Sequence, residues 1–261
     1  MRTVLTIAGF DPSGGAGVAA DLKTFAALKT YGIAVITSLT SQNTQKVYAT
    51  FHQSVEIVKA QLIPLCEDFQ IDAVKIGMLP TRELIELVAE IITNYGLKNV
   101  VIDPVFRSSS GHDLIDAEAR GLLVEKLFPL AAVITPNLDE ASVLLQRSIT
   151  NETEMKAAAE ELQKHKNSSA AVLIKGGHLE GAALDVLFHN NAIKTFSVPR
   201  VLTRNTHGTG CTLASAIAAF LAHGATISEA VQQAKEYVTE ALKISLEVGK
   251  GKGSLNHFHQ L

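Results

Sequence analysis

The sequence of 261 residues predicts an α/β fold in which helices cover both faces of a mostly parallel sheet. Short apolar, β-rich segments alternate along the chain with longer segments that place apolar residues at helical spacing. Parallel strands need crossover connections and are buried on both faces, which makes them apolar throughout. The length and the 47% hydrophobic composition allow one large core, so we expect a single domain over residues 1–261.

The expected elements follow one another in a regular order. Six short apolar segments predict buried strands at residues 4–8, 33–40, 73–76, 100–102, 131–134 and 171–174. Amphipathic segments predict helices at residues 19–28, 55–66, 81–92, 117–127, 154–162, 210–223 and 228–246. Two strand-like segments within 183–198 are joined through His189, Asn190 and Asn191, which predicts a hairpin. Only residues 249–254 have a flexible composition, and no internal repeat is visible.

Charge and cysteine content exclude several classes of protein. The net charge is −3 and charges of both signs are interleaved, so we expect no nucleic-acid partner. The apolar stretch near the start is too short to span a bilayer, which predicts a buried strand and no membrane association. Cys66 and Cys211 are far apart and form no CxxC pair, which is typical of a reducing compartment and indicates a cytoplasmic protein.

The sharpest local motif is residues 205–212, Asn-Thr-His-Gly-Thr-Gly-Cys-Thr, which leads directly into an apolar helix. Free N–H groups and the positive dipole end at a helix start form an anion site. Glycines such as Gly208 and Gly210 let a phosphate approach the backbone closely. The alternative is that these glycines only shape a loop and Cys211 is a small buried thiol.

A second glycine-rich segment, residues 9–17, follows the first strand and precedes the first helix. Gly9 and Gly14 have the spacing of a Walker motif, but Gly15 stands where that motif requires lysine. The segment also lacks the spacing of a dinucleotide fingerprint, which argues against an oxidoreductase. A tight strand-to-helix turn is the structural alternative.

Polar groups also stand at three expected strand ends, where parallel sheets present their ligands. Asp103 and Glu140 could hold Mg²⁺, which takes oxygen ligands and bridges nucleotide phosphates. Lys175, beside two glycines, could meet a phosphate. Each has an ordinary alternative: an Asp before Pro ends a strand, an acid in a first helical turn complements the dipole, and a lysine after a strand is usually solvated.

Taken together, several motifs resemble the hydroxymethylpyrimidine/phosphomethylpyrimidine kinases of thiamine biosynthesis nearly end to end. These enzymes belong to the ribokinase-like superfamily, so the resemblance implies a three-layer α/β/α sandwich. Cysteine at position 211 narrows the family, because most of the superfamily carries aspartate there as base. The motifs are residues 8–9 with 11–17, 20–25, 42–44, 103–105, 134–137, 175–178 and 205–212.

The resemblance implies ATP-dependent phosphorylation of 4-amino-5-hydroxymethyl-2-methylpyrimidine and then of its monophosphate. It also implies Mg²⁺, a homodimer and, as an open expectation, a monovalent cation. Carried onto this sequence, it assigns catalysis to Gly208, Thr209, Gly210 and Cys211, and metal binding to Asp103 and Glu140. It assigns substrate binding to Gly9, Asp21, Gln42, Asn43, Met78 and Val105, and ATP binding to Asn137, Lys175, Thr206, Gly208 and Gly210.

Gln42 bears on whether the substrate is an aminopyrimidine or pyridoxal. Its amide offers a donor and an acceptor, which could pair with the amino group and adjacent nitrogen of an aminopyrimidine. Related pyridoxal kinases commonly have an apolar residue here, and a pyridoxal kinase is the nearest alternative function. A catalytically silent ligand-binding regulator of the same fold is the second. Cys211 is the expected base, with a pKa lowered toward neutrality by the helix start.

The sequence departs from the family pattern at a few positions. Phe106, Arg107, Ser108 and Ser109 replace a more usual apolar run ending in lysine, so the loop after Asp103 could cover the site differently. Phe10 stands where a small residue is commoner and Ala19 where glutamine is usual. None of these departures removes a proposed catalytic group. His257 and His259 lack a third ligand and indicate a packed or solvated tail rather than a metal site.

Overall fold

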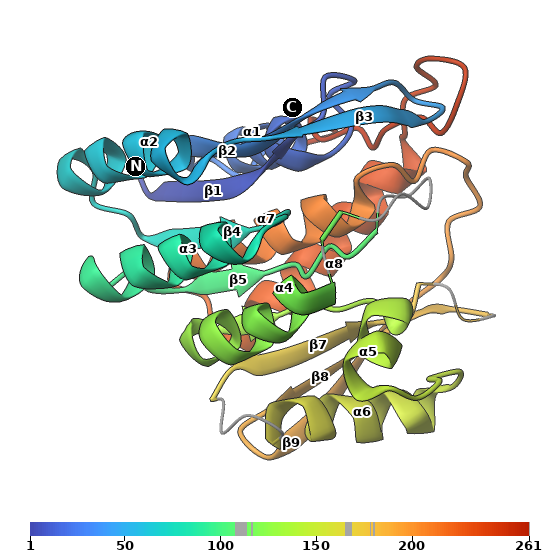
Figure 1. Ribbon diagram of the computed structural model, residues 1–261. Helices are drawn as coiled ribbons and strands as arrows, with labels where there is room; N and C mark the ends of the chain where they lie inside the picture. Colours follow the sequence, from blue (N-terminus) through green and yellow to red (C-terminus); the bar gives the residue numbers. More distant parts are fainter. Residues whose placement is uncertain (108–113, 116, 165–168, 178, 180, 261) are drawn as a thin grey trace.

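A computed structural model describes residues 1–107, 114–115, 117–164, 169–177, 179 and 181–260. Its nine strands form one sheet in the order β3-β2-β1-β4-β5-β6-β7-β8-β9 (Figure 1). The strands are β1 Thr3–Phe10, β2 Tyr31–Gln42, β3 Val47–His52, β4 Ala73–Ile76, β5 Val100–Ile102, β6 Val133–Ile134, β7 Ala171–Lys175, β8 Ala183–His189 and β9 Ala192–Val198. The α-helices are α1 Gly17–Ala27, α2 Val55–Asp68, α3 Arg82–Asn94, α4 Ala117–Leu122, α5 Leu138–Leu145, α6 Glu152–Lys164, α7 Thr209–Ala222 and α8 Ile227–Lys243.

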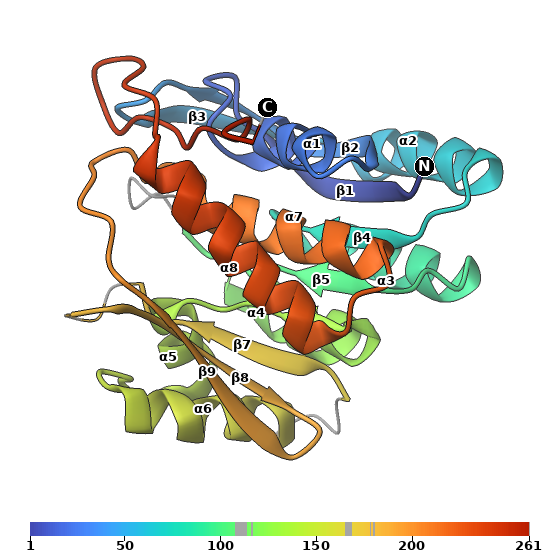
Figure 2. The same ribbon diagram turned by 180° about the vertical axis from the view of Figure 1, so that it is seen from behind.

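Helices cover both faces of this sheet. Helices α2 to α6 lie on the face toward the viewer in Figure 1, and α1, α7 and α8 lie on the opposite face, seen in Figure 2. Each face has its own hydrophobic core, one including α3 and α6 and the other formed largely by α7 and α8. The predicted α/β sandwich of three layers is therefore confirmed.

The sheet topology locates the expected ligand site. Strands β2, β1, β4, β5, β6 and β7 pair in parallel, whereas β3, β8 and β9 join antiparallel. The chain runs from β1 to β2 on one side and returns to place β4 on the other side of β1. Such a reversal leaves a crevice at the carboxyl ends of the strands, where ligands bind.

Local signals predicted most elements closely. Asn190 and Asn191 adopt φ values of 52° and 57°, as the predicted two-residue hairpin turn between β8 and β9 requires. Three features were not predicted. Strand β3 pairs with β2, α5 follows β6, and the helix expected at 117–127 changes after Leu122 into the π-helical turn Leu123–Leu127.

The expectation of a flexible segment at 249–254 is wrong. The backbone N–H groups of Gly251 and Lys252 donate to Thr44, and that of Gly253 donates to Asn205 Oδ1. The segment is therefore tied to the turn between β2 and β3 and to the loop before α7. Glycine is needed here because the backbone of this segment lies against the backbone of Thr44. A Cβ on Gly251 would lie 2.0 Å from the Thr44 carbonyl oxygen.

Candidate active site

The start of α7 and the glycine-rich loop at 9–17 form one packed unit. Gly208 caps α7 with φ of 80°, and a Cβ there would lie 1.8 Å from the carbonyl oxygen of Gly15. A Cβ on Gly15 would in turn lie 2.3 Å from His207 Cδ2. Only glycine fits at these contacts, so the two glycine motifs exist to bring two backbone segments together.

The first turn of α7 presents free amide groups. The N–H of Thr212 is the first to use an acceptor one full turn back, the carbonyl of Gly208, at 2.9 Å. The preceding N–H groups of Gly210 and Cys211 therefore stand at the open end of the helix, where the dipole is positive. Thr209 donates its hydroxyl to the Thr206 carbonyl, which rigidifies this corner. The arrangement is a cradle for negative charge.

Lys175 and Asp103 lie directly beside this cradle. Lys175 Nζ donates to Asp103 Oδ1 at 2.6 Å, and Thr135 donates to the same oxygen at 3.2 Å. A Cβ on Gly210 would lie 3.3 Å from Lys175 Nζ and 3.5 Å from Asp103 Oδ2. Burial alone would lower the pKa of Lys175, but the carboxylates of Asp103 and Glu140 raise it, so the ammonium stays charged.

Glu140 is a buried carboxyl next to that ion pair. It forms a capping box with Asn137 at the start of α5, in which each side chain accepts from the other residue's backbone N–H. Burial, aided by the charge of Asp103, raises the pKa of Glu140 to about 7, although Lys175 and two backbone N–H groups act to lower it. A cation near Asp103 and Glu140 would relieve this repulsion, and oxygen ligands suit a hard divalent ion.

A second buried charge pair lies beneath Cys211. Asp21 is completely buried and accepts from Lys75 Nζ at 2.9 Å and from the Thr6 and Ser215 hydroxyls at 2.6 Å each. Burial acts to lower the pKa of Lys75, but Asp21, Cys211 and Asp103 raise it above its usual value. Asp21 was predicted to bind substrate, but its enclosure does not support direct contact; the carboxylate instead holds Lys75.

The thiol of Cys211 contradicts one expectation. Burial raises its pKa, and the charges of Asp21 and Asp103 add to that effect. The ammonium of Lys75 and a hydrogen bond from the Gly17 backbone act in the opposite direction but do not outweigh it. The prediction of a pKa lowered toward neutrality is therefore wrong, because it considered the helix start without the neighbouring burial and carboxylates.

The other predicted substrate residues lie nearer to β1 and β2. A Cβ on Gly9 would lie 3.0 Å from Met78 Sδ, so these two residues are in contact. Gln42 ends β2, is half-buried, and places its amide nitrogen 3.3 Å from His207 Nε2. Val105 follows β5 and is half-buried. Asn43 is exposed, and its carboxamide oxygen accepts from backbone N–H groups in the β2–β3 turn.

The contact between His207 and Asp11 orients this region. His207 Nε2 lies 2.7 Å from Asp11 Oδ2, which requires the proton on that nitrogen because a carboxylate only accepts. Asp11 also accepts from the backbone of Ser13 and Ala16. Burial alone would raise the pKa of Asp11, but His207 and Ser13 bring it below its usual value.

Sequence reasoning missed Lys75, and the signal was available. Lys75 is the one charged residue in the four-residue strand β4, and all four positions are buried. A lysine within an apolar strand must have a carboxylate partner, which could have been sought in the first helix. Thr206, predicted to bind ATP, is exposed, and its carbonyl accepts from the Thr209 hydroxyl. Ser108, Ser109 and His178 lie outside the described residues.

Comparison with known proteins identifies the family. A model of the phosphomethylpyrimidine kinase family matches residues 11–256. The chain belongs to the phosphomethylpyrimidine kinase family. A hydroxymethylpyrimidine/phosphomethylpyrimidine kinase of Rhizobium meliloti is 46% identical, with 98% of this chain and 97% of the relative covered. The chain therefore shares a kinase family with proteins of its own length.

Two other comparisons extend this result. The thiamine biosynthesis bifunctional protein ThiED of Geobacter sulfurreducens is 45% identical over 98% of this chain, but the chain spans about half, 52%, of that relative. The solved structure of a Bacillus subtilis pyridoxal kinase, described as an ADP complex, superimposes with a TM-score of 0.91 at 38% identity, covering 100% of this chain and 98% of the other. The predicted ribokinase-like fold is thus confirmed, and the fold is shared by kinases of two different rings.

Proposed function

We propose that this member of the phosphomethylpyrimidine kinase family transfers a phosphoryl group from ATP to 4-amino-5-hydroxymethyl-2-methylpyrimidine and then to its monophosphate, in thiamine biosynthesis. One observation carries the proposal: the amide cradle at the start of α7 lies beside the Lys175–Asp103 pair and contains Cys211. Phosphoryl transfer depends on positioning and on charge stabilisation, and this arrangement supplies both.

In this proposal the chain's own groups divide the work. The N–H groups of Gly210 and Cys211 bind the oxygens of the transferred group, and Lys175 neutralises charge on the nucleotide phosphates. Asn137, at the start of α5, stands next to Lys175 in a backbone bridge and would help to place the nucleotide. Because the start of α7 and Lys175 are held by hydrogen bonds, they need little rearrangement during the reaction.

The proton of the first step goes to Cys211. As the hydroxymethyl oxygen bonds to phosphorus and the bond to ADP breaks, the alcohol proton moves to Sγ. The raised pKa of Cys211 means that the thiolate is scarce at neutral pH, so turnover should rise with pH. Lys75 is the charged neighbour that favours the thiolate.

Asp103 and Glu140 are the residues that would hold Mg²⁺, directly or through water. They fit, because both are carboxyls, both are buried, and the charge of Asp103 raises the pKa of Glu140 in the absence of a cation. When bound, the ion supplies neutralisation of phosphate charge. Among the described residues, no group of three or more metal-ligating side chains is present, so water and phosphate oxygens would complete the shell.

The ring is proposed to lie near Gln42, Gly9, Met78 and Val105. Gln42 has one amide that can pair with an aminopyrimidine, and His207 lies beside it. A pyridoxal kinase is the second candidate, because the superposition with the Bacillus subtilis pyridoxal kinase has a TM-score of 0.91. Ring discrimination therefore depends on side chains such as Gln42 rather than on the fold.

We also propose that the chain acts as one domain, in the cytoplasm, as a homodimer. All nine strands join one sheet, and within the described part of the chain no helix has the length and apolar character needed to cross a bilayer. The edge near β3 exposes Leu39, Tyr48, Phe51 and Ile57, which would be covered in a dimer. Sedimentation equilibrium would test this, and a monomer at micromolar concentration would contradict it.

A coupled ADP-release assay tests the function. Hydroxymethylpyrimidine, its monophosphate and pyridoxal are offered separately, and we expect the two pyrimidines to be the better substrates. Preference for pyridoxal would favour the second candidate, and no ADP release with any alcohol would indicate a silent regulator.

Cys211→Ala tests the proton acceptor. Turnover of the alcohol should fall by about 100-fold or more, with near-normal ATP affinity. Turnover of the monophosphate should fall much less, because a phosphate oxygen is largely deprotonated at pH 7. Cys66→Ala is the control, since Cys66 lies on α2. Unchanged turnover of the alcohol would remove Cys211 from this role.

A further inference from the structure

A cavity lies beside Gln42, and most of its lining is not used by the chemistry described so far. It has a volume of about 570 Å³ and lies between the β2–β3 turn, the loop before α7 and the C-terminal segment. Its lining residues are Gln42, Asn43, Thr44, Gln45, Lys46, Arg204, His207, Gly251 and Lys252. A volume of this order suits a small molecule rather than a macromolecular surface.

Backbone hydrogen bonds hold the walls of this cavity together. The N–H of Gly251 donates to Thr44 Oγ1 at 3.0 Å, and the N–H of Lys252 donates to the Thr44 carbonyl at 3.0 Å. On the other side, the N–H of His207 donates to the carbonyl of Gly253 at 3.2 Å. The segments that carry the lining residues are therefore joined by main-chain hydrogen bonds.

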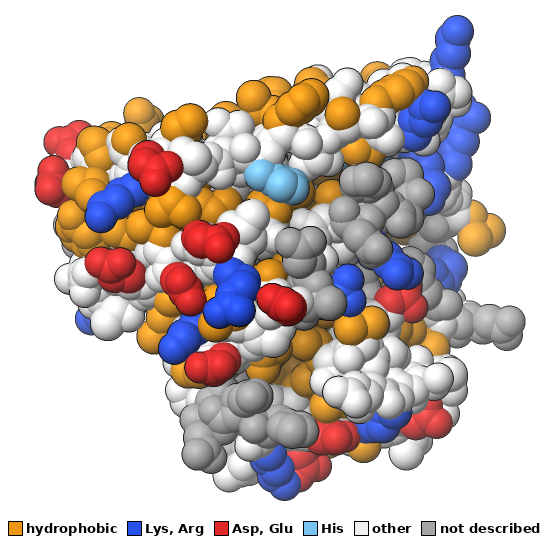
Figure 3. Space-filling view, in the orientation of Figure 1, with side chains coloured by type: hydrophobic (Ala, Val, Ile, Leu, Met, Phe, Trp, Pro, Cys, Tyr) orange, Lys and Arg blue, Asp and Glu red, His pale blue; other side chains and the backbone are white. Residues whose placement is uncertain are grey.

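The charge of the lining is one-sided. Lys46, Arg204 and Lys252 line the cavity, and none of the described aspartates or glutamates does. Among the described residues, none of these three cations forms an ion pair with a carboxylate; Lys46 Nζ instead lies 4.6 Å from the ring centre of Tyr48. Lys and Arg side chains gather at the upper right of Figure 3, where Figure 1 places the C-terminal segment.

This concentration of cations contrasts with the whole chain, which has a net charge of −3. Unpaired like charges repel one another, and a ligand with two negative charges would remove that repulsion. The side-chain amides of Gln42, Asn43 and Gln45 add neutral hydrogen-bond donors to the same lining. Arginine and lysine together with amide donors are the chemistry that binds a phosphate monoester.

We propose that this cavity captures the phosphate monoester produced by the first transfer, before its second phosphorylation. The inference rests on the proposed function. Gln42 and His207 line the cavity and also lie where the ring is expected, so one phosphorylated pyrimidine can reach both regions. The monoester is favoured over the nucleotide as the occupant, because Lys175, Asp103 and Asn137 do not line the cavity.

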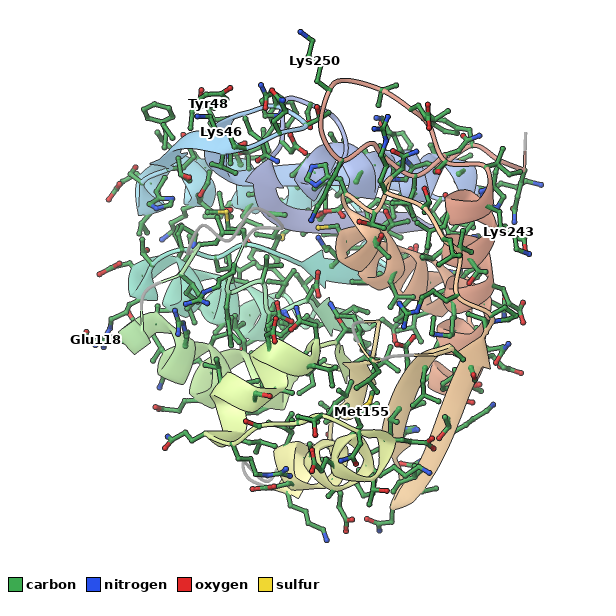
Figure 4. The ribbon with its side chains drawn as sticks, turned by 90° about the vertical axis from the view of Figure 1, so that its right-hand side faces the viewer. Lys46, Tyr48, Glu118, Met155, Lys243 and Lys250 are labelled. Carbon is green, nitrogen blue, oxygen red and sulfur yellow. The ribbon has the colours of Figure 1, made fainter. Side chains whose placement is uncertain are left out.

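The test compares two substrates in one variant. Lys46→Gln, Arg204→Gln and Lys252→Gln are combined; all three side chains are exposed, so the fold should be retained. We expect kcat/KM for the monophosphate to fall about 30-fold and kcat/KM for the unphosphorylated alcohol to change less than about threefold. Lys250→Gln is the matched control, because Lys250 is in the same segment but points away from the protein in Figure 4.

Calorimetric titration with the monophosphate and, separately, with inorganic phosphate, both without ATP, gives a second readout. The wild-type chain should bind the monophosphate at one site, and the affinity should fall at high salt because the attraction is between charges. The triple variant should bind the monophosphate at least about tenfold more weakly than the wild type. Binding of inorganic phosphate with equal affinity would place only the phosphate, and not the ring, in the cavity, which overturns the proposal as stated.

Equal losses for both substrates, or unchanged kcat/KM for the monophosphate, would also overturn it. A different result would contradict the proposed kinase function. If wild-type chain phosphorylates neither pyrimidine, the calorimetric comparison of wild-type and triple variant still decides whether the cavity binds the monophosphate. A rise in KM for ATP in the triple variant would show that the cations serve the nucleotide instead, and would refute the assignment.

Discussion

Replacing Lys75 by methionine separates the electrostatic role of the buried ion pair from its structural role. Lys75 is completely buried, and its Nζ lies 2.9 Å from Asp21 Oδ2. Loss of Lys75 leaves a buried carboxylate that, among the described residues, keeps only the Thr6 and Ser215 hydroxyls as donors. Breaking a buried pair in this way costs about 3–5 kcal/mol, and the two remaining hydrogen bonds place Lys75→Met near the lower value.

The catalytic effect has a different origin. The ammonium of Lys75 lowers the pKa of Cys211, so its removal raises that pKa further. Each unit by which that pKa rises corresponds to about 1.4 kcal/mol and to a tenfold smaller thiolate fraction. We therefore expect kcat for the alcohol to fall at neutral pH by about tenfold for each unit by which the pKa rises, and its pH profile to move to higher pH. Lys75 stays positively charged over the pH range of the assay, because its pKa is raised. Its stabilising charge is lost only when the pH rises through the pKa that Lys75 has in the folded state.

The double variant Asp21→Asn with Lys75→Met is the control. Asp21 raises the pKa of Cys211 and Lys75 lowers it, so removal of both should return the pH profile toward that of wild type. It should also recover much of the lost stability, because no unpaired charge remains buried. The measurements are kcat against pH and chemical denaturation. A folded Lys75→Met protein with an unchanged pH profile would refute the proposed influence of Lys75 on the proton acceptor.

Three further variants test other parts of the site. The pKa of Glu140 is raised to about 7, so burying this carboxyl destabilises the folded protein increasingly as the pH rises from about 4.5 to 7. Glu140→Gln should remove this pH dependence, which amounts to up to about 3 kcal/mol of the free energy of unfolding, in thermal melts recorded at several pH values. Gly208→Ala should abolish activity and cost at least about 3 kcal/mol, whereas Gly224→Ala, also at positive φ but facing open space, should cost only about 1 kcal/mol and keep activity. Asp185 accepts from the N–H of Gly176 at 3.1 Å and from Nζ of buried Lys235, so Asp185→Ala should lower stability and also raise KM for ATP roughly tenfold with a smaller change in kcat; an unchanged KM would remove this positioning role.

The elements that sequence reasoning located well have strong local signals. Asn190 and Asn191 favour the left-handed backbone that the β8–β9 turn requires, and this signal needs no tertiary information. Strand β3 has no comparable signal of burial, since Tyr48 and Phe51 on it are exposed and it lies at the sheet edge. The π-helical turn after α4 could not be predicted, because apolar spacing alone does not distinguish it from an α-helix.

The sequence predicted which residues at the strand ends form the site, but it did not predict the buried ion pair or the direction in which the pKa of Cys211 moves. Asp103, Glu140 and Lys175 were singled out because parallel strands end at one edge of the sheet, and the structure does bring them together. Lys75 and the direction of the Cys211 pKa depend on what packs behind the helix start, which is set by residues such as Asp21, 190 positions away in the chain from Cys211. The residues next to Cys211 in the sequence do not predict which distant residues will bury it.

Asp103 links the two halves of this electrostatic arrangement. Its charge raises the pKa of Glu140 on one side and the pKa of Cys211 on the other. Neutralisation of Asp103 by a cation would therefore lower both values together, making the metal carboxyl easier to ionise and the thiolate easier to form. In that case the proton acceptor is weakest in the empty protein and strengthens only when the nucleotide's counter-ion arrives. A thiol with a raised pKa is consequently compatible with a role as base, because its ligand-free state is not the state in which it reacts.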